Sequence, residues 1–399
     1  MCNCCCNPDY YFVYRGLDQY LVGIPNPKEY DKLKSLNEDV MLKVSEFKAR
    51  ASKWFTTPRR LSSNSDVVEM MKTVINPEKD LHPLYHSVTK RKDNLDVLNG
   101  KRVLLLISGL NIASEDITNL KRVTIDSERD VIVWIPIIKH SISGSDDVKN
   151  QLETMQNLMP WYSIHQPSLI EDGAIEAFRN EWYFKDRPIL VVSSPQAKEL
   201  NKNAIFMVRI WQNLPVDSLS SEMELQLWEK QTWNLKLLIN DIIDPIIHEW
   251  IRAGSYILMY GSDDIDWIRN FIKQSHSVLC DLFVHVEMVY VGNSHNKDRG
   301  CKVEDVIVTE KLSHCLPESS RAYFWSRINS MIASKDKLEK MNDPTDKLLQ
   351  EILRFTSHEE WALLAKGSTI IGQGPGRIAM TALEDIEKWR TIRDESRTK

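Results

Sequence analysis

The chain has 399 residues, of which 42% are hydrophobic and 27% charged, with a formal net charge of −5. These totals predict a globular protein of two or three domains. The acidic balance argues against nucleic-acid binding, which needs an excess of Lys and Arg. No apolar run approaches the roughly 18 residues of a membrane span, and the N-terminus shows no secretory signal. We therefore expect a cytoplasmic protein without a membrane span.

The seven cysteines are unevenly distributed along the chain, with none between Cys6 and Cys280. Their odd number and irregular spacing argue against a secreted disulfide framework. Four thiols within the first six residues are too crowded for a relaxed tetrahedral metal site. We interpret them as part of a disordered tail, with acylation or metal binding as the alternative. This cluster comprises Cys2, Cys4, Cys5 and Cys6.

The first hundred residues predict little regular structure. We expect residues 1–75 to form a partial helical region with a disordered tail. Helical spacing extends over 41–55, and a short helix is expected at Val67–Ile75. Two prolines, a basic cluster (Lys90–Lys92) and a glycine predict a linker over 76–100.

The stretch 76–205 is predicted to hold a layered α/β domain. Its apolar runs are typical of strands buried on both faces of a central sheet. We expect a helical stretch after the Met159–Tyr162 run and a further helix at Glu176–Phe184. The expected strands are Val103–Ser108, Val131–Ile135 and Pro188–Val192.

The order of these elements is that of a thioredoxin-like domain without its reactive pair. In a thioredoxin enzyme the first strand runs into Cys-x-x-Cys, whereas here it runs into Ser108–Ala113. Pro188 stands where such domains carry a cis-proline before a strand, although a trans-proline that opens a strand fits equally. The missing dithiol favours a structural or binding role over catalysis.

The second half, 206–399, is predicted to form a second α/β domain with a helical C-terminal region. An amphipathic helix is expected near 221–239, and a shorter helix is expected to begin at the cap Asp244 and end at Gly254. A β-α-β unit follows over residues 256–291. Beyond residue 318 only helices are predicted, one of them starting at Ser357 with Glu360 in a capping box. The sequence shows no internal repeat.

Several motifs suggest chemistry but have simpler explanations. We interpret the acidic run at Asp263, Asp264 and Asp266 as the start of a helix rather than a cation site. The glycines of Gly372–Arg377 lack the spacing of a phosphate loop and predict a flexible linker. His82 and His86 are separated by a proline, which weakens a helical ligand pair. We therefore assign no catalytic, cofactor-binding or metal-binding residue.

An ordered set of sequence runs over residues 76–395 resembles the plant sieve element occlusion proteins, the structural phloem proteins that include forisome subunits. No single motif is diagnostic, but their order is specific. The runs are Pro83–Lys90, Val103–Ser108, Val133–Ile137, Met159–Ser163, Arg187–Val192, Asp244–Ile246, Tyr260–Arg269, Glu287–Gly292 and Glu310–His314, with Trp228, Trp233, Leu237 and Leu238 among them.

The resemblance implies a non-enzymatic protein of phloem sieve elements. Such a protein would assemble with itself or with relatives into filaments that seal sieve tubes after wounding. Some members respond to calcium, but the resemblance assigns no calcium site here. The family's N-terminal domain and Cys-rich tail are not recognisable, so we expect a chain truncated at both ends. The alternatives are an oxidoreductase that uses Cys280, Cys301 or Cys315, and an adaptor that does not polymerise.

Overall fold

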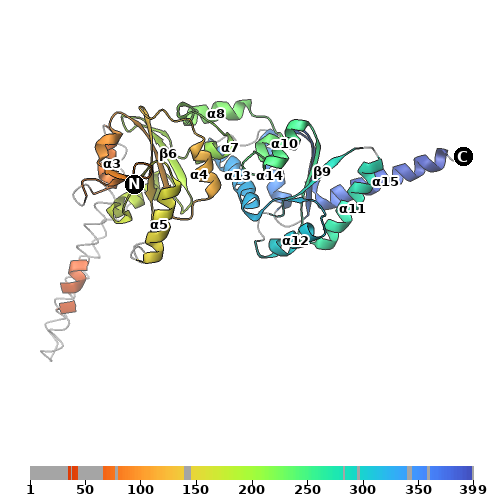
Figure 1. Ribbon diagram of the computed structural model, residues 1–399, viewed down its shortest axis with the longest axis horizontal. Helices are drawn as coiled ribbons and strands as arrows, with labels where there is room; N and C mark the ends of the chain where they lie inside the picture. Colours follow the sequence, from red (N-terminus) through yellow and green to blue (C-terminus); the bar gives the residue numbers. More distant parts are fainter. Residues whose placement is uncertain are drawn as a thin grey trace, which may run out of the picture.

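The protein contains two mixed β-sheets with helices packed on both faces of each (Figure 1). The computed structural model describes residues 35–36, 38–43, 66–76, 80–138, 145–281, 284–293, 297–338, 344–356 and 360–397. The N-terminal cysteine cluster and most of the predicted helix 41–55 lie outside these residues. Among the described residues, no helix is both long enough and apolar enough to cross a membrane.

The first sheet has seven strands in the order β2-β1-β5-β4-β3-β6-β7. Its strands β3, β4 and β5 are parallel, whereas β6 runs antiparallel to β3 and β7 antiparallel to β6. The strands are β1 (Leu84–His86), β2 (Arg91–Asp93), β3 (Arg102–Ser108), β4 (Asp130–Pro136), β5 (Tyr162–Ile164), β6 (Ile189–Ser193) and β7 (Glu199–Asn201).

Strands β3 and β4 form the centre of this sheet because their side chains are apolar on both faces. In β3, Val103, Leu105 and Ile107 pack into the core beneath α3 and α6. Leu104 and Leu106 point to the opposite face, beneath α4, α5 and α7. The helices of this unit are α3 (Val67–Val74), α4 (Ser114–Lys121), α5 (Asp146–Leu158), α6 (Asp172–Glu181) and α7 (Ile205–Ile210).

The second sheet has five strands in the order β10-β9-β8-β11-β12. Strands β8, β9 and β10 are parallel, and the hairpin β11–β12 runs antiparallel beside β8. The strands are β8 (Tyr256–Gly261), β9 (Val286–Tyr290), β10 (His314–Cys315), β11 (Trp361–Lys366) and β12 (Thr369–Pro375).

Helices cover both faces of the second sheet. The core on one face includes residues of α9, α10, α13 and α14, and the core on the other includes residues of α11, α12 and α15. Helix α8 connects the two units along the chain. The helices are α8 (Ser221–Lys230), α9 (Leu235–Leu238), α10 (Pro245–Ala253), α11 (Ile265–Asp281), α12 (Lys297–Thr309), α13 (Glu318–Lys337), α14 (Pro344–Thr356) and α15 (Gly376–Arg397).

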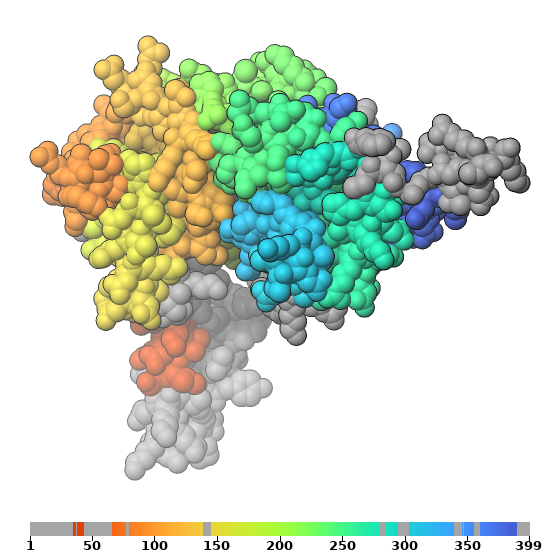
Figure 2. Space-filling view, turned by 45° about the vertical axis from the view of Figure 1, so that its right-hand side comes forward, coloured from red at the N-terminus to blue at the C-terminus, as the bar shows by residue number. Residues whose placement is uncertain are grey.

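The two sheets share one topology, although the sequence shows no repeat. The order β5-β4-β3-β6-β7 in the first sheet corresponds strand by strand to β10-β9-β8-β11-β12 in the second. In both, three parallel strands joined through helices are followed by an antiparallel hairpin beside the first of them. The chain therefore contains two structurally equivalent α/β units, and Figure 2 shows them packed directly against each other.

The expected mixed α/β fold and its main strands are confirmed. The central strands of the first sheet and the β8-α11-β9 unit form where the sequence predicts them. The predicted caps of α10 are also confirmed. The Asp244 side chain accepts hydrogen bonds from the amides of Ile246 and Ile247, and Gly254 is left-handed with φ 74°.

The predicted linker 76–100 is wrong, because it contains the β1–β2 hairpin. Strand β1 pairs with both β2 and β5, and Lys90 ends the turn with φ 57°. Charged residues dominate β2 because it lies at the sheet edge, where polar side chains discourage pairing with other chains. The expected helical stretch after Met159 is also wrong, because Tyr162–Ile164 forms β5.

The purely helical C-terminal region and the flexible glycine linker are wrong as well. Trp361–Lys366 is strand β11, which pairs with β8 on one side and β12 on the other. Its Leu, Ala and Lys residues favour helices, but burial between two strands overrides that preference. The glycines of Gly372–Arg377 lie mainly in β12. The helix expected near 221–239 is interrupted at 231–234, where Asn234 caps α9.

We predict that Gly261→Ala destabilises the second unit. A Cβ atom at Gly261 would lie 2.2 Å from Trp361 Nε1 and 2.5 Å from the Gly292 carbonyl oxygen. The backbone and side chains around the new methyl group would have to shift to avoid this overlap. That shift should lower the free energy of unfolding by about 1–3 kcal/mol. Urea unfolding followed by circular dichroism measures the change. Gly372→Ala is the control, because nothing lies within 4 Å of its Cβ position, and an equal loss in both variants would contradict the prediction.

Candidate functional site: a cleft and a polar seam

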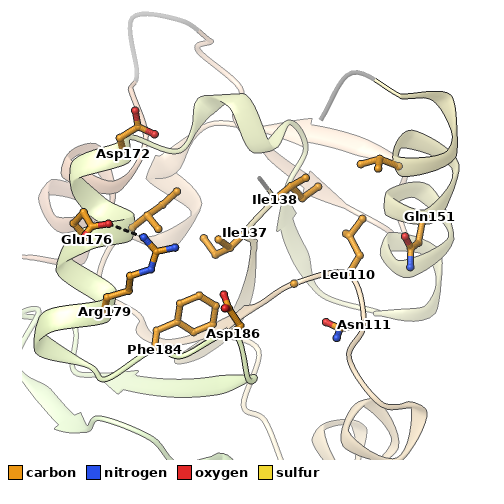
Figure 3. A pocket seen from close by; sticks show the side chains of 13 residues that line it. Leu110, Asn111, Ile137, Ile138, Gln151, Asp172, Glu176, Arg179, Phe184 and Asp186 are labelled. Carbon is orange, nitrogen blue, oxygen red and sulfur yellow. Dashed lines mark hydrogen bonds and ion pairs between the residues drawn. The ribbon is translucent and has the colours of Figure 1, made fainter. Parts of the chain in front are cut away.

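A cleft opens at the carboxyl ends of β3 and β4 in the first sheet (Figure 3). Ligands of open α/β sheets bind at this edge, because parallel strands deliver their following loops to one place. The loop after β3 supplies Leu110 and Asn111, and the chain after β4 supplies Ile137 and Ile138. Helices α5 and α6 form the walls of this cavity of about 640 Å³.

The cleft combines apolar walls with an acidic rim. Its carboxylates come from Asp172 and Glu176 on α6 and from Asp186 in the following loop. Arg179 Nη1 donates a hydrogen bond to Glu176 Oε1 at 2.6 Å, so the one guanidinium among the described lining residues is already paired. Figure 3 shows Arg179 and Asp186 pointing into the space in front of Ile137. The arrangement suits binding of a cationic group that carries apolar surface.

The structure brings together the two features that the sequence analysis singled out in this region. Ile107 of β3 pairs with Ile189 of β6, which places Pro188 beside the end of β3. The peptide bond before Pro188 is trans, because the described residues contain no cis peptide bond. Of the two alternatives for Pro188, the trans-proline that opens a strand is therefore correct, and the cis-proline is wrong. The sequence places no cysteine between residues 7 and 279, so the loops around this cleft carry no thiol.

The C-terminal cysteines belong to the second unit. Cys280 lies in α11 and Cys301 in α12, whereas Cys315 lies in the short strand β10. Helices α11 and α12, and strand β9 with which β10 pairs, lie across the molecule from β6 (Figure 1). Burial raises the pKa of the Cys315 thiol to about 11. A thiol with so little thiolate at neutral pH is a poor nucleophile.

The remaining sequence motifs have structural roles. Asp264 Oδ1 accepts hydrogen bonds from the backbone amides of Asp266 and Trp267, which confirms the expected helix start. The ring of His86 lies 4.6 Å from that of Tyr162, and the amide of His82 bonds to Asp80. Within the part of the chain that the structure describes, no group of three or more His, Cys, Asp or Glu side chains is placed to hold a metal ion.

A second group of polar residues, which we call the polar seam, joins the two units. Along α13, five residues repeat at intervals of four and three: Tyr323, Arg327, Ser330, Ser334 and Lys337. This spacing places them on one face of the helix, and each bonds to α4, α7, α8 or the chain beside them. The apolar residues of α13, such as Phe324 and Ile328, pack beneath the second sheet.

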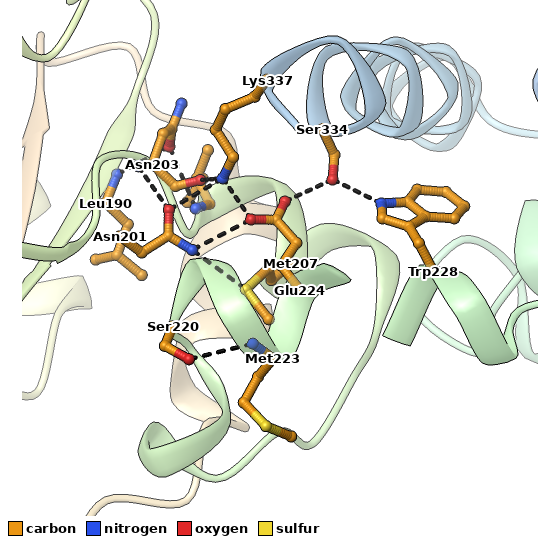
Figure 4. A network of polar contacts seen from close by, with 11 residues as sticks. Leu190, Asn201, Asn203, Met207, Ser220, Met223, Glu224, Trp228, Ser334 and Lys337 are labelled. Atoms are coloured by element: carbon orange, nitrogen blue, oxygen red, sulfur yellow. Dashed lines mark hydrogen bonds and ion pairs between the residues drawn. The ribbon is translucent and has the colours of Figure 1, made fainter. Parts of the chain in front are cut away.

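One end of the polar seam is centred on Glu224 of α8, which is fully buried (Figure 4). Its carboxylate forms an ion pair with Lys337 and accepts hydrogen bonds from Ser334 Oγ at 2.5 Å and Asn201 Nδ2 at 3.2 Å. Lys337 also donates to Asn201 and to the carbonyl of Asn203. Burial lowers the pKa of Lys337, and the Glu224 carboxylate opposes this effect.

The other end of the polar seam is centred on two arginines. Arg209 of α7 forms a bidentate pair with the buried Asp116 of α4, at 2.7 and 2.6 Å, and donates to Ser330. Burial opposes the charge of Arg209, but the carboxylate prevails and raises its pKa. Arg327, 2% exposed, donates to the carbonyls of residues 209, 210 and 237. Its pKa falls to about 10 because of burial.

The sequence analysis missed the polar seam, although the sequence carries a signal for it. The alternating intervals of four and three between polar residues in α13 mark a polar stripe of the kind that usually faces water. Nothing in the spacing identifies the partners on α4, α7 and α8, because these bonds span 110 to 204 residues of the sequence. Only the packing of the two units shows that the stripe is buried.

We predict a strongly asymmetric response to breaking the Glu224–Lys337 pair. Lys337→Met leaves a fully buried carboxylate without its cation, which should cost about 3–5 kcal/mol of unfolding free energy. Glu224→Gln should cost less, because the Lys337 side chain is 22% exposed and can reach water. Urea unfolding of both variants and of the double variant measures the coupling.

The exposed Lys72–Glu69 pair provides the control, since Glu69→Gln should change the unfolding free energy by less than about 0.5 kcal/mol. Strictly additive losses for Lys337→Met and Glu224→Gln in the double variant would show that the two residues are not coupled.

Comparisons with known proteins place the chain in a family. A family model of the sieve element occlusion C-terminus matches residues 222–397. Protein SIEVE ELEMENT OCCLUSION B of Arabidopsis thaliana is 34% identical over 350 residues, covering 83% of this chain and 47% of the relative. Protein SIEVE ELEMENT OCCLUSION A of the same plant is 31% identical over 343 residues, covering 81% and 41%.

A third relative, Protein SIEVE ELEMENT OCCLUSION C, is 28% identical over 246 residues, covering 60% of this chain and 34% of the relative. No solved structure matches significantly. The chain thus spans about half the length of the curated relatives it matches, and the matches to them extend well beyond the C-terminal region. The chain belongs to the sieve element occlusion family.

Proposed function

We propose that the chain is a non-enzymatic structural protein of the phloem, which associates with itself or with relatives into filaments that seal sieve tubes after wounding. Family membership is the observation that carries this proposal. The relatives are named for sieve element occlusion, so the proposed place of action is the cytoplasm of sieve elements. A calcium response is part of the same proposal, although no residue is assigned to it.

We also propose that the first unit is a thioredoxin-like domain that keeps the fold but lacks the reactive cysteine pair. The order β4-β3-β6-β7, with β3 parallel to β4 and antiparallel to β6, supports this reading. The equivalent topology of the second unit extends the proposal to both sheets.

The proposed domain division is 1–75, 76–205 and 206–399, with α3 packing across the first boundary into the core of the first unit. Its last boundary lies at the start of α7, a helix that contributes to both units. Met207 and Val208 pack beneath the first sheet, whereas Ile210 packs beneath the second. The two α/β domains are therefore proposed to act as one body joined by the polar seam.

Two alternative functions, a thiol oxidoreductase and an adaptor that does not polymerise, would each require a property that can be tested. A thiol oxidoreductase needs a reactive cysteine beside Pro188, but that region contains none and Cys315 is held in its thiol form. A turnover of insulin reduction above that of dithiothreitol alone would revive this alternative. An adaptor that does not polymerise would remain a monomer at every concentration.

We predict that Cys315 reacts slowly with iodoacetamide at pH 7.5. A pKa of about 11, against about 9 for the free thiol, reduces the thiolate fraction about a hundredfold. Peptide mass spectrometry after timed alkylation measures this residue separately from the other cysteines. Unfolding in urea should restore rapid labelling, and equal rates in folded and unfolded protein would contradict the assignment.

We predict that the purified chain self-associates as its concentration rises to high micromolar values. Sedimentation velocity should show large species whose share grows with concentration, and negative-stain microscopy should show them to be elongated. The same runs with calcium and with a chelator test the calcium response. A single monomer boundary at every concentration would contradict filament formation and favour the adaptor.

A further inference from the structure

We propose that the cleft at the carboxyl ends of β3 and β4 binds residues 47–61 of a second copy of this protein. This inference rests on the self-association proposed above, and it names the contact that would carry it. The argument depends on the cleft's charge, on its counterpart in the second unit and on the sequence of the segment.

The acidic rim of the cleft favours a basic occupant, and its apolar walls favour one that also carries apolar side chains. Three carboxylates and one guanidinium line it among the described residues, and Glu176 already pairs with the guanidinium of Arg179. The carboxylates of Asp172 and Asp186 complete the acidic rim. Leu110, Ile137 and Ile138 provide the apolar surface between the walls.

The equivalent position in the second unit is occupied by the protein's own side chains. Trp361, the first residue of β11, donates from Nε1 to the Gly292 carbonyl at 3.2 Å beyond the end of β9. Tyr290 donates to the Ser262 carbonyl at 3.1 Å beyond the end of β8. In the first unit the register position of Trp361 is held by Pro188, and the aromatic side chain that lines the cleft is Phe184, from the loop before β6. The cleft in front of Phe184 stays open, so it can receive an aromatic side chain from another chain.

The sequence supplies a segment with the required chemistry. Residues 47–61, which lie outside the described residues, contain five basic residues and no acidic one. Trp54 and Phe55 provide large aromatic side chains of the kind that anchor interfaces. The five basic residues are Lys48, Arg50, Lys53, Arg59 and Arg60.

A contact of this kind leads to a filament rather than a closed dimer. The segment and the cleft are different parts of the chain, so each copy offers one of each and the interface is heterologous. Heterologous interfaces produce open polymers unless the rotation between copies closes a ring. The proposed contact therefore explains how a chain without a reactive group could assemble.

The first test measures the contact without relying on filaments. A fluorescein-labelled synthetic peptide of residues 47–61 is titrated with the full chain, and its anisotropy is recorded. To remove competition from the chain's own segment, the titrated chain carries Arg59→Glu and Arg60→Glu. We expect saturable binding that weakens at high salt. Adding Asp172→Lys and Asp186→Lys to that chain should weaken binding at least about tenfold, because two attractive pairs become repulsive.

The second test is a charge swap followed by sedimentation velocity. One chain carries Asp172→Lys and Asp186→Lys in the cleft, and another carries Lys53→Glu, Arg59→Glu and Arg60→Glu in the segment, which changes the formal charge of the segment from +5 to −1. Each alone should lose self-association, because its cleft and segment then have the same charge. Their mixture should recover it, since both contacts between the two chains are complementary. A general loss of folding in either variant would not produce this recovery.

A matched control carries Glu153→Lys and Glu351→Lys, which change the net charge equally at exposed positions outside the cleft. It should associate like the original chain. Failure of the peptide to bind, or equal binding to the chain with the reversed cleft, would overturn the inference even if filaments form. Peptide binding by a chain that stays monomeric would instead contradict the proposed function while supporting the contact.

Discussion

The buried polar stripe of α13 is the constraint on which the arrangement of the whole molecule depends. A helix whose residues on one side pack beneath the second sheet must also satisfy five polar side chains on the other. Buried charges are tolerated only when they are paired and hydrogen-bonded. Helices α4, α7 and α8 supply those partners, so the two units can meet in one orientation that leaves Glu224 and Arg327 satisfied.

This constraint explains why two α/β units behave as parts of one framework. An apolar interface between them could slide, because apolar contacts are not directional. The hydrogen bonds that cross between the units are directional: Asn119 bonds to Tyr323, Arg209 donates to Ser330, and Arg327 donates to the carbonyls of residues 209 and 210. The position of the cleft relative to the second unit is fixed in consequence.

The two units share one topology but differ at the carboxyl ends of their parallel strands. Both use three parallel strands and an antiparallel hairpin, and both bring their loops to the carboxyl ends of the parallel strands. In one unit those ends are covered by Trp361 and Tyr290, and in the other they open into an acidic cleft. The same topology is therefore closed by the protein's own side chains in one unit and open as a cleft in the other.

The sequence by itself determined the central strands, the main helix caps and the family. Strands such as Val103–Ser108 are apolar on both faces, so their burial does not depend on details of their neighbours. Asp244 and Gly254 act through local backbone geometry, which is also written in the sequence. The lack of a dithiol after the first strand is likewise a property of the sequence alone.

The tertiary structure decided the features that depend on partners distant in the chain. Strand β11 consists of residues with good helix propensity and became a strand because β8 and β12 pair with it on both sides. The hairpin β1–β2 has a charged edge strand that does not look like a strand in isolation. The polar seam and the cleft exist only where separate elements meet, since electrostatic pairing and cavity shape depend on distances that no local sequence pattern encodes.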